Sequence, residues 1–293
     1  MTNHSASVLT RDSVAIINPR WVLFLRALWI FVALNSIFSF GMTLYFTWDF
    51  ALHLPPRIVA GLSALGWSTG IYFWYNAFLL LTNFACFYVI GVVIYLLRPK
   101  ERMALFASIF FMAFASANSY IASHEYLEVF RTGPPLYAVS FNLNNLFAWP
   151  LFIAFCAVFP TGHFVPHWTR YLAVLGFVIT ILWSSFPEQF ANPQGAMVFM
   201  LILFLLIMFG GSFLAQILRY RDYSTSAQRQ QTKWLLYGLA LIVLGTILIP
   251  TIFYIILPTS GFTGARMTVL ADLVGNTVST LFVILPLAVG VAI

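Results

Sequence analysis

Two histidines in one short segment come closest to the spacing of a metal site. His163 and His167 stand four residues apart, and on a helix that spacing would place both rings on one face. Pro166 interrupts such a helix, and no Cys, Asp or Glu stands nearby to complete a ligand set. Pro160 and Gly162 instead fit a β-turn. The segment therefore predicts a sharp reversal of the chain and no metal site.

The sequence contains no recognisable set of catalytic residues. His-Glu-x-x-His, Gly-x-Ser-x-Gly and the phosphate-binding Gly-x-x-x-x-Gly-Lys are all absent. Cys86 and Cys156 lie deep in apolar segments, where cysteine usually serves as a small packing residue. We therefore predict no catalytic, cofactor-binding or metal-binding residues, and we do not expect this chain to be an enzyme by itself.

Polar residues near the ends of apolar segments form the first candidate site. We consider an outer polar pocket lined by Asn118, His124, Asn142 and Asn145. The simpler alternative is that the asparagines hydrogen-bond between helices, as polar residues in membrane helices commonly do. Pro150 is expected to kink the helix just beneath this site.

The second candidate site is a basic connecting segment that contains Arg219, Arg221, Arg229 and Lys233. Within it, Thr225 and Gln228 have the spacing of a capping box, which predicts that a helix begins there, before the membrane. Arg229 and Lys233 then share one face of that helix. One explanation is an anchor on anionic lipid, and the other is a docking site for a cytoplasmic signalling element.

The composition requires that these residues be positioned by membrane helices. The 293 residues are 61% hydrophobic and only 8% charged, whereas ordinary soluble domains carry about 25% charged residues. The net charge of +6 does not indicate nucleic-acid binding, because the basic residues stand between long apolar blocks. We therefore expect an all-α, polytopic helix bundle in the plasma membrane, with the lipid bilayer as its main partner.

The apolar blocks predict about eight transmembrane helices after a cytoplasmic tail of residues 1–20. The expected spans are Trp21–Phe46, Gly70–Leu97, Met103–Ser123, Ala138–Phe159, Tyr171–Phe186, Ala196–Leu218, Trp234–Leu257 and Thr268–Ile293. We expect the outer loop 47–69 to hold an interfacial segment that is too short to cross the membrane. The inner loops are 98–102, 160–170 and 219–233.

The distribution of basic residues predicts the orientation. With a cytoplasmic N-terminus, most of the arginines and lysines fall on the inner side, and only Arg57, Arg131 and Arg266 fall on the outer side. An even number of spans then places the C-terminus in the cytoplasm as well. Tyr171–Phe186 is the shortest expected span, and if it does not cross, the C-terminus lies outside.

The last apolar run, Leu281–Ile293, has no polar residue after it. A membrane helix normally ends in interfacial aromatic or basic residues. We therefore expect the natural polypeptide to continue beyond Ile293 into a cytoplasmic output domain. The alternative is a protein whose C-terminus lies flush with the membrane.

Four segments together resemble the N-terminal multi-span membrane region of bacterial sensor histidine kinases, of a type frequent in Chloroflexi-like bacteria. They are Arg102–Ser108, Phe159–Arg170, Gln228–Gly238 and Ile284–Ile293. The similarity covers most of the chain in the same order. In that family, dimerisation and ATP-binding kinase domains follow, so no catalytic residue of the family has a counterpart here. The resemblance implies a signal-input domain.

The leading hypothesis is thus the sensor domain of a two-component histidine kinase. It would act as part of a homodimer and relay a stimulus to a cytoplasmic kinase domain and its response regulator. A second hypothesis is a small transporter or channel, which would require charges within the membrane or broken helices. A third is a standalone membrane protein that docks a separate cytoplasmic partner through Leu218–Trp234.

Overall fold

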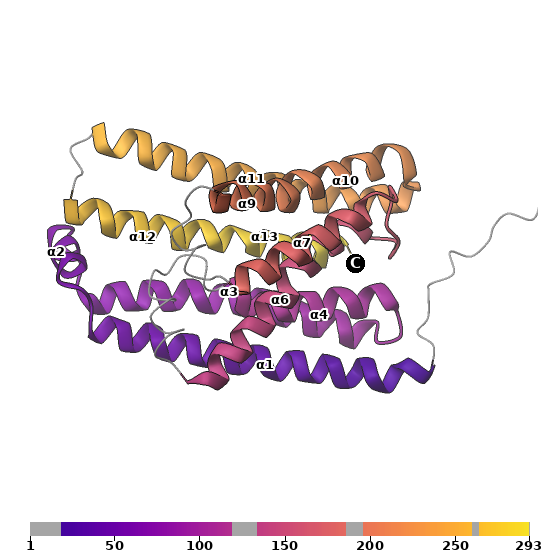
Figure 1. Ribbon diagram of the computed structural model, residues 1–293, viewed down its shortest axis with the longest axis horizontal. Helices are drawn as coiled ribbons and strands as arrows, with labels where there is room; N and C mark the ends of the chain where they lie inside the picture. Colours follow the sequence, from indigo (N-terminus) through magenta and orange to yellow (C-terminus); the bar gives the residue numbers. More distant parts are fainter. Residues whose placement is uncertain (1–18, 119–133, 186–195, 260–263, 293) are drawn as a thin grey trace, which may run out of the picture.

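The computed structural model describes residues 19–118, 134–185, 196–259 and 264–292, and these residues form helices and no strands (Figure 1). The α-helices are α1 (Pro19–Leu52), α2 (Pro56–Ala64), α3 (Thr69–Leu97), α4 (Arg102–Ala117), α6 (Pro135–Val158), α7 (Thr169–Ser185), α9 (Ala196–Leu205), α10 (Ser212–Leu218), α11 (Ser226–Thr259), α12 (Gly264–Thr280) and α13 (Ile284–Ala292). Two π-helical turns, η2 (Leu206–Gly211) and η3 (Arg219–Tyr223), flank α10. A 3-10 turn, η4 (Leu281–Val283), joins α12 to α13.

Among the described residues, six helical stretches are long and apolar enough to cross a membrane. They are Trp21–Leu52, Thr69–Leu97, Pro135–Val158, Ile202–Tyr223, Ser226–Phe253 and Gly264–Val291. Large apolar side chains on their outer faces are widely exposed, for example Leu23 (81%) and Trp74 (70%). A soluble protein rarely exposes so much contiguous apolar surface. The chain therefore has the properties of a multi-pass membrane protein.

The structure confirms an all-helical bundle with several membrane-length helices, as predicted, and six of the predicted spans reach that length among the described residues. The predicted spans Met103–Ser123 and Tyr171–Phe186 correspond to α4 and α7. These helices have 16 and 17 described residues, fewer than the ~20 that a span usually needs. The outer loop is also shorter than predicted, because α1 continues to Leu52.

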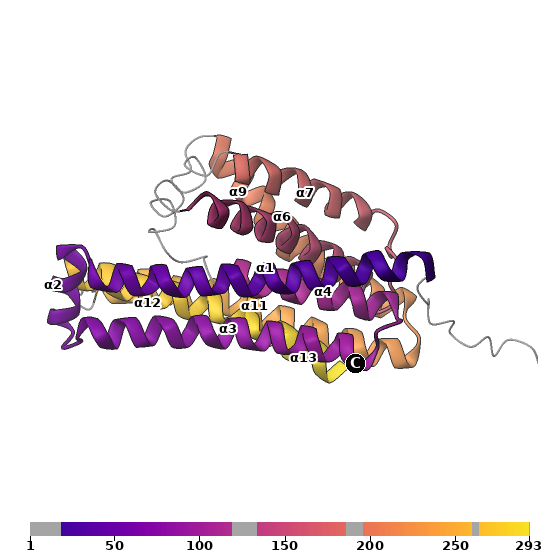
Figure 2. The ribbon, with the colours of Figure 1, turned by 90° about the horizontal axis from the view of Figure 1, so that it is seen from below.

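The described loops between helices lie at two opposite ends of the molecule. The loops at 98–101, 159–168 and 224–225 gather at one end, which we call the basic end (Figure 1). The opposite end, called the α2 end, holds α2 and the first turns of α3 and α12. Most helices follow the long axis, whereas α6 and α7 cross them obliquely (Figure 2). This up-and-down path places the predicted inner loops together.

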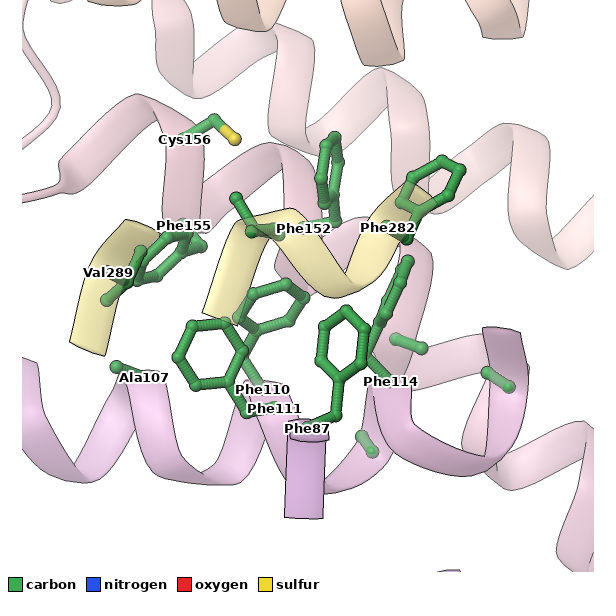
Figure 3. Close-up of a cluster of buried hydrophobic side chains, with 14 of the residues drawn as sticks. Phe87, Ala107, Phe110, Phe111, Phe114, Phe152, Phe155, Cys156, Phe282 and Val289 are labelled. Atoms are coloured by element: carbon green, nitrogen blue, oxygen red, sulfur yellow. The ribbon is translucent and has the colours of Figure 1, made fainter. Parts of the chain in front are cut away.

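Phenylalanine side chains fill the centre of the bundle (Figure 3). The rings of Phe110 and Phe155 stack with their centroids 5.0 Å apart, and those of Phe114 and Phe282 lie 5.7 Å apart. These rings join α4, α6 and η4 in one apolar core. Every residue of α4 from Phe110 onward is buried, which explains why this helix is apolar on all sides despite its short length.

The predicted interfacial segment forms α2, which packs on α12 and α3. Leu62, Tyr72 and Val269 are buried together and make a small second core at the α2 end. Gly61 permits this contact, since a Cβ at this position would collide with the carbonyl oxygen of Ala265. The segment is therefore held by protein contacts and does not rest on lipid alone.

This close approach predicts the effect of one added methyl group. Gly61→Ala should destabilise the fold by about 1–3 kcal/mol, because backbone atoms must move to admit the Cβ. Gly41→Ala on α1 is the matched control, since a Cβ there would meet nothing within 4 Å. Thermal unfolding of the purified protein in nanodiscs provides the comparison. Equal melting temperatures for the two variants would show that α2 does not pack on α12 in this way.

Candidate functional site

Arg219 is buried at the basic end, with only 1% of its surface exposed. Its guanidinium donates to the carbonyl ends of α6 and to the loop that follows. Nη1 lies 3.1 Å from the Val158 carbonyl and 2.7 Å from Thr161 Oγ1, and Nη2 lies 2.8 Å from the Ala157 carbonyl and 2.5 Å from the His163 carbonyl. The buried charge is therefore surrounded by backbone oxygens.

Gln216 extends this arrangement by one turn. Its side-chain amide donates to the carbonyls of Cys156 and Phe159. Together, Gln216 and Arg219 bind the carbonyls of residues 156–159, most of which have no partner inside α6 because the helix ends there. We call this pair of side chains and its acceptors the carbonyl clamp.

The carbonyl clamp balances charge without a carboxylate. The C-terminus of a helix carries a partial negative charge from its aligned peptide dipoles, and a cation placed there is stabilised. Within the described part of the chain, no ion pair includes Arg219. The end of α6 and the loop carbonyls therefore act as the counter-charge.

A tight hairpin between η3 and α11 positions the clamp. The Thr225 backbone donates to Gln228 Oε1 (3.2 Å) and the Gln228 backbone donates to Thr225 Oγ1 (3.4 Å), which confirms the predicted capping box. Ser224 Oγ donates to the Arg219 carbonyl at 2.9 Å, so the turn is also tied to the helix before it.

The other three predicted coupling residues remain on the surface. Arg221 pairs with Asp222 at 2.8 Å, and Arg229 donates to the Arg221 carbonyl at 3.5 Å. Lys233 Nζ lies 5.6 Å from the centre of the Tyr237 ring. Arg219 therefore differs in kind from its neighbours: it holds the fold together, whereas Arg221, Arg229 and Lys233 are accessible to lipid or to a partner. Charge spacing gave no signal of this difference.

A second set of polar contacts, called here the polar ladder, joins α3 to α12 from the α2 end inward. The Tyr72 hydroxyl donates to Asp272, and Asn276 donates to Asn76 Oδ1 at 2.8 Å. Because the members on each helix are four residues apart, they share one face. Tyr75 contacts Thr277 beside them.

Asn118, from the predicted outer pocket, completes the polar ladder at its inner end. Its amide donates to Asn83 Oδ1 (3.0 Å) and to the Ser279 carbonyl (3.1 Å), and Asn83 in turn donates to Thr280 Oγ1 (3.3 Å). Asn118 is fully buried. It therefore joins α4 to α3 and α12, as the simpler alternative predicted.

The remaining pocket residues lie elsewhere or cannot be placed. Asn142 is half-buried on α6, and Asn145 accepts from Trp149 Nε1 at 3.2 Å within the same helix. His124 lies outside the described residues. The structure thus gives Asn118 and Asn145 separate hydrogen-bond partners.

Sequence analysis missed the contact between α1 and α6. Asn144 donates to Ser39 Oγ at 2.7 Å and accepts from Asn35 at 2.8 Å, and Ser140 donates to Asn35 Oδ1 at 2.8 Å. The four-residue spacing of Asn35 and Ser39, and of Ser140 and Asn144, was the available signal. These bonds fix the oblique α6, which carries the acceptors of the carbonyl clamp.

The carbonyl clamp predicts unequal effects of removing two neighbouring arginines. Arg219→Gln should destabilise the protein by about 3 kcal/mol, because several buried carbonyls lose a charged donor. Arg221→Gln should change stability by less than about 1 kcal/mol, since its ion pair with Asp222 is exposed. Thermal unfolding in nanodiscs measures both. Equal losses would contradict a structural role specific to Arg219.

Comparison with known proteins provides no family for this chain. No family model matches it, and neither a curated protein nor a solved structure is significantly similar. Function must therefore be inferred from the residues and contacts of the carbonyl clamp, the polar ladder and the aromatic core.

Proposed function

We propose that this chain is the membrane-embedded signal-input domain of a two-component sensor histidine kinase. A stimulus at the α2 end or in the bilayer would change helix packing, and the change would pass to a cytoplasmic output domain. The four segments that resemble such kinases support this assignment. Two of them, Phe159–Arg170 and Gln228–Gly238, include or adjoin the carbonyl clamp.

The path of α12, η4 and α13 is the observation that carries the proposal. Asp272 and Asn276 of α12 take part in the polar ladder at the α2 end. The same stretch passes through the aromatic core at Phe282 and continues to the buried Val289 of α13, toward the basic end (Figure 2). A shift of α12 against α3 would therefore move α13.

The aromatic core favours a sensor over a transporter or channel. Phe110, Phe114, Phe152 and Phe155 are completely buried between the polar ladder and the carbonyl clamp. A transport path needs polar or charged groups along the membrane interior. A packed layer of phenylalanine instead transmits mechanical displacement, because close-packed interiors deform little.

The proposed orientation places the basic end in the cytoplasm, with about eight crossings. At the basic end, Arg98 and Lys100 lie in a loop, and Arg170, Arg221 and Arg229 lie in helical turns next to loops. Arg57 and Arg266 lie toward the α2 end. An excess of basic residues in short cytoplasmic loops is the strongest determinant of orientation. The N-terminus and α13 would then both face the cytoplasm.

A standalone protein with a separate soluble partner is the second candidate. The exposed Arg221, Arg229 and Lys233 at the tip of the hairpin support it, because they are accessible and the carbonyl clamp holds their backbone in place. If a partner co-purifies with the wild type, Arg229→Ala combined with Lys233→Ala should abolish its capture and leave membrane insertion intact.

The kinase proposal predicts how a change in the polar ladder affects activity. In the full-length polypeptide encoded by the gene, Asn276→Leu should change the rate of autophosphorylation by about three-fold. This follows because an interhelical hydrogen bond in a membrane contributes about 0.6 kcal/mol. The measurement uses proteoliposomes and radiolabelled ATP.

Thr82→Val on α3 is the control, because the Thr82 hydroxyl bonds only the Phe78 carbonyl of its own helix, at 2.8 Å. It should leave the rate unchanged. A full-length protein without ATP-dependent autophosphorylation would refute the kinase assignment. Ion or solute flux through the same proteoliposomes would favour the transporter.

A further inference from the structure

Four buried polar atoms at the basic end have no nitrogen or oxygen hydrogen-bond partner in the protein, and one of them, Ser212 Oγ, lies against the weakly hydrogen-bonding thiol of Cys156. They are Ser212 Oγ, Gln216 Oε1, Arg219 Nε and Thr232 Oγ1. Across the described residues only one other buried side-chain atom, Asn118 Oδ1, has this property. All four side chains are at most 1% exposed. Buried polar groups are almost always satisfied, so their concentration in one region requires a cause.

The hairpin geometry brings Gln216, Arg219 and Thr232 to neighbouring turns of the bundle, and Ser212 lies one turn further along α10. Ser212, Gln216 and Arg219 follow the i, i+4, i+7 spacing of a single helix face. Gln216 stands eight residues before Ser224, and Thr232 stands seven residues after Thr225. Because Ser224 and Thr225 form the hairpin turn, Gln216 and Thr232 lie side by side on antiparallel helices. Two of the four atoms, Gln216 Oε1 and Arg219 Nε, belong to the side chains of the carbonyl clamp itself.

The chemistry of the four atoms selects the ligand. Arg219 Nε–H can only donate and Gln216 Oε1 can only accept, while the two hydroxyls can do either. The Gln216 amide cannot be reversed, because its nitrogen already donates to the carbonyls of Cys156 and Phe159. A cation would be repelled by Arg219, and an anion by Gln216 Oε1. A neutral ligand that donates and accepts fits all four.

We propose that this is an internal site for bound water, which joins α10 to α11 at the carbonyl clamp. Water would accept from Arg219 Nε–H, donate to Gln216 Oε1 and bond the Thr232 hydroxyl. Buried waters typically make about three hydrogen bonds to groups that lack protein partners. The guanidinium would then be fully hydrogen-bonded. The site does not depend on the signalling role.

The direction in which one isosteric substitution shifts the melting temperature tests the proposal. With water bound, Thr232→Val removes a partner of that water and should lower the melting temperature by about 3 °C. In a dry site the same change removes an unsatisfied hydroxyl and raises the melting temperature. Thr246→Val, also on α11, is the control, because the Thr246 hydroxyl bonds the Ile242 carbonyl at 2.7 Å. It should shift the melting temperature by less than about 1 °C.

Hydroxyl-radical footprinting gives an independent test, because X-ray pulses generate radicals from bound water inside a protein. Cys156 is fully buried and adjoins the site through Ser212. Its oxidation rate, divided by that of the fully buried Met112 in the same protein, should be several-fold higher in the wild type than in Thr232→Val. An equal ratio in the two proteins, or a higher melting temperature for Thr232→Val, would overturn the proposal.

Discussion

A buried guanidinium that pairs with no carboxylate of the described residues imposes the strongest constraint on this structure. Moving a charge out of water costs several kcal/mol unless hydrogen bonds replace its hydration. Arg219 obtains those bonds from the end of α6 and from the loop that follows it. Carbonyl oxygens can surround a cation only at a helix end or in an irregular loop. Arg219, which precedes the η3–α11 hairpin, must therefore lie at the end of α6, and this fixes the position of the hairpin relative to α6.

The rest of the fold holds α6 in the position that the carbonyl clamp requires. In a bilayer, the hydrophobic effect does not drive helices together, so close packing and interhelical hydrogen bonds must do so. The bonds between α1 and α6 hold one side of the clamp, and the aromatic core fills the space between α6, α4 and η4. Polar contacts thus lie at the basic end, between α3 and α12 and between α1 and α6, and they surround an apolar core.

Much of the fold could be predicted from the sequence, because each main element depends on local pattern. The apolar blocks became helices, and the capping box at Thr225 marked the start of α11. Six of the predicted spans are membrane-length helices, and α4 and α7 are shorter within the described residues. Hydrophobicity alone does not separate a helix in contact with lipid from one buried in protein, and α4 is buried on all sides along its second half.

The candidate sites were less predictable, because burial and helix phase are tertiary properties. Arg219 and Arg221 look alike in sequence, yet one is buried and the other exposed. On α6, the prediction chose Asn142 and Asn145, whereas Asn144 makes the contact with α1. One residue along a helix rotates a side chain by about 100°, so an uncertainty of one position selects another face.

The central claim is that Arg219 joins the loop after α6 to the η3–α11 hairpin, and a distance measurement tests it most directly. Spin labels at the exposed His167 and Tyr223, with Cys86 replaced by alanine and the buried Cys156 retained, report the separation of the two segments by double electron–electron resonance. We predict one narrow distance distribution in the wild type and a clearly broader one in Arg219→Gln. Identical distributions in the two proteins would contradict the claim.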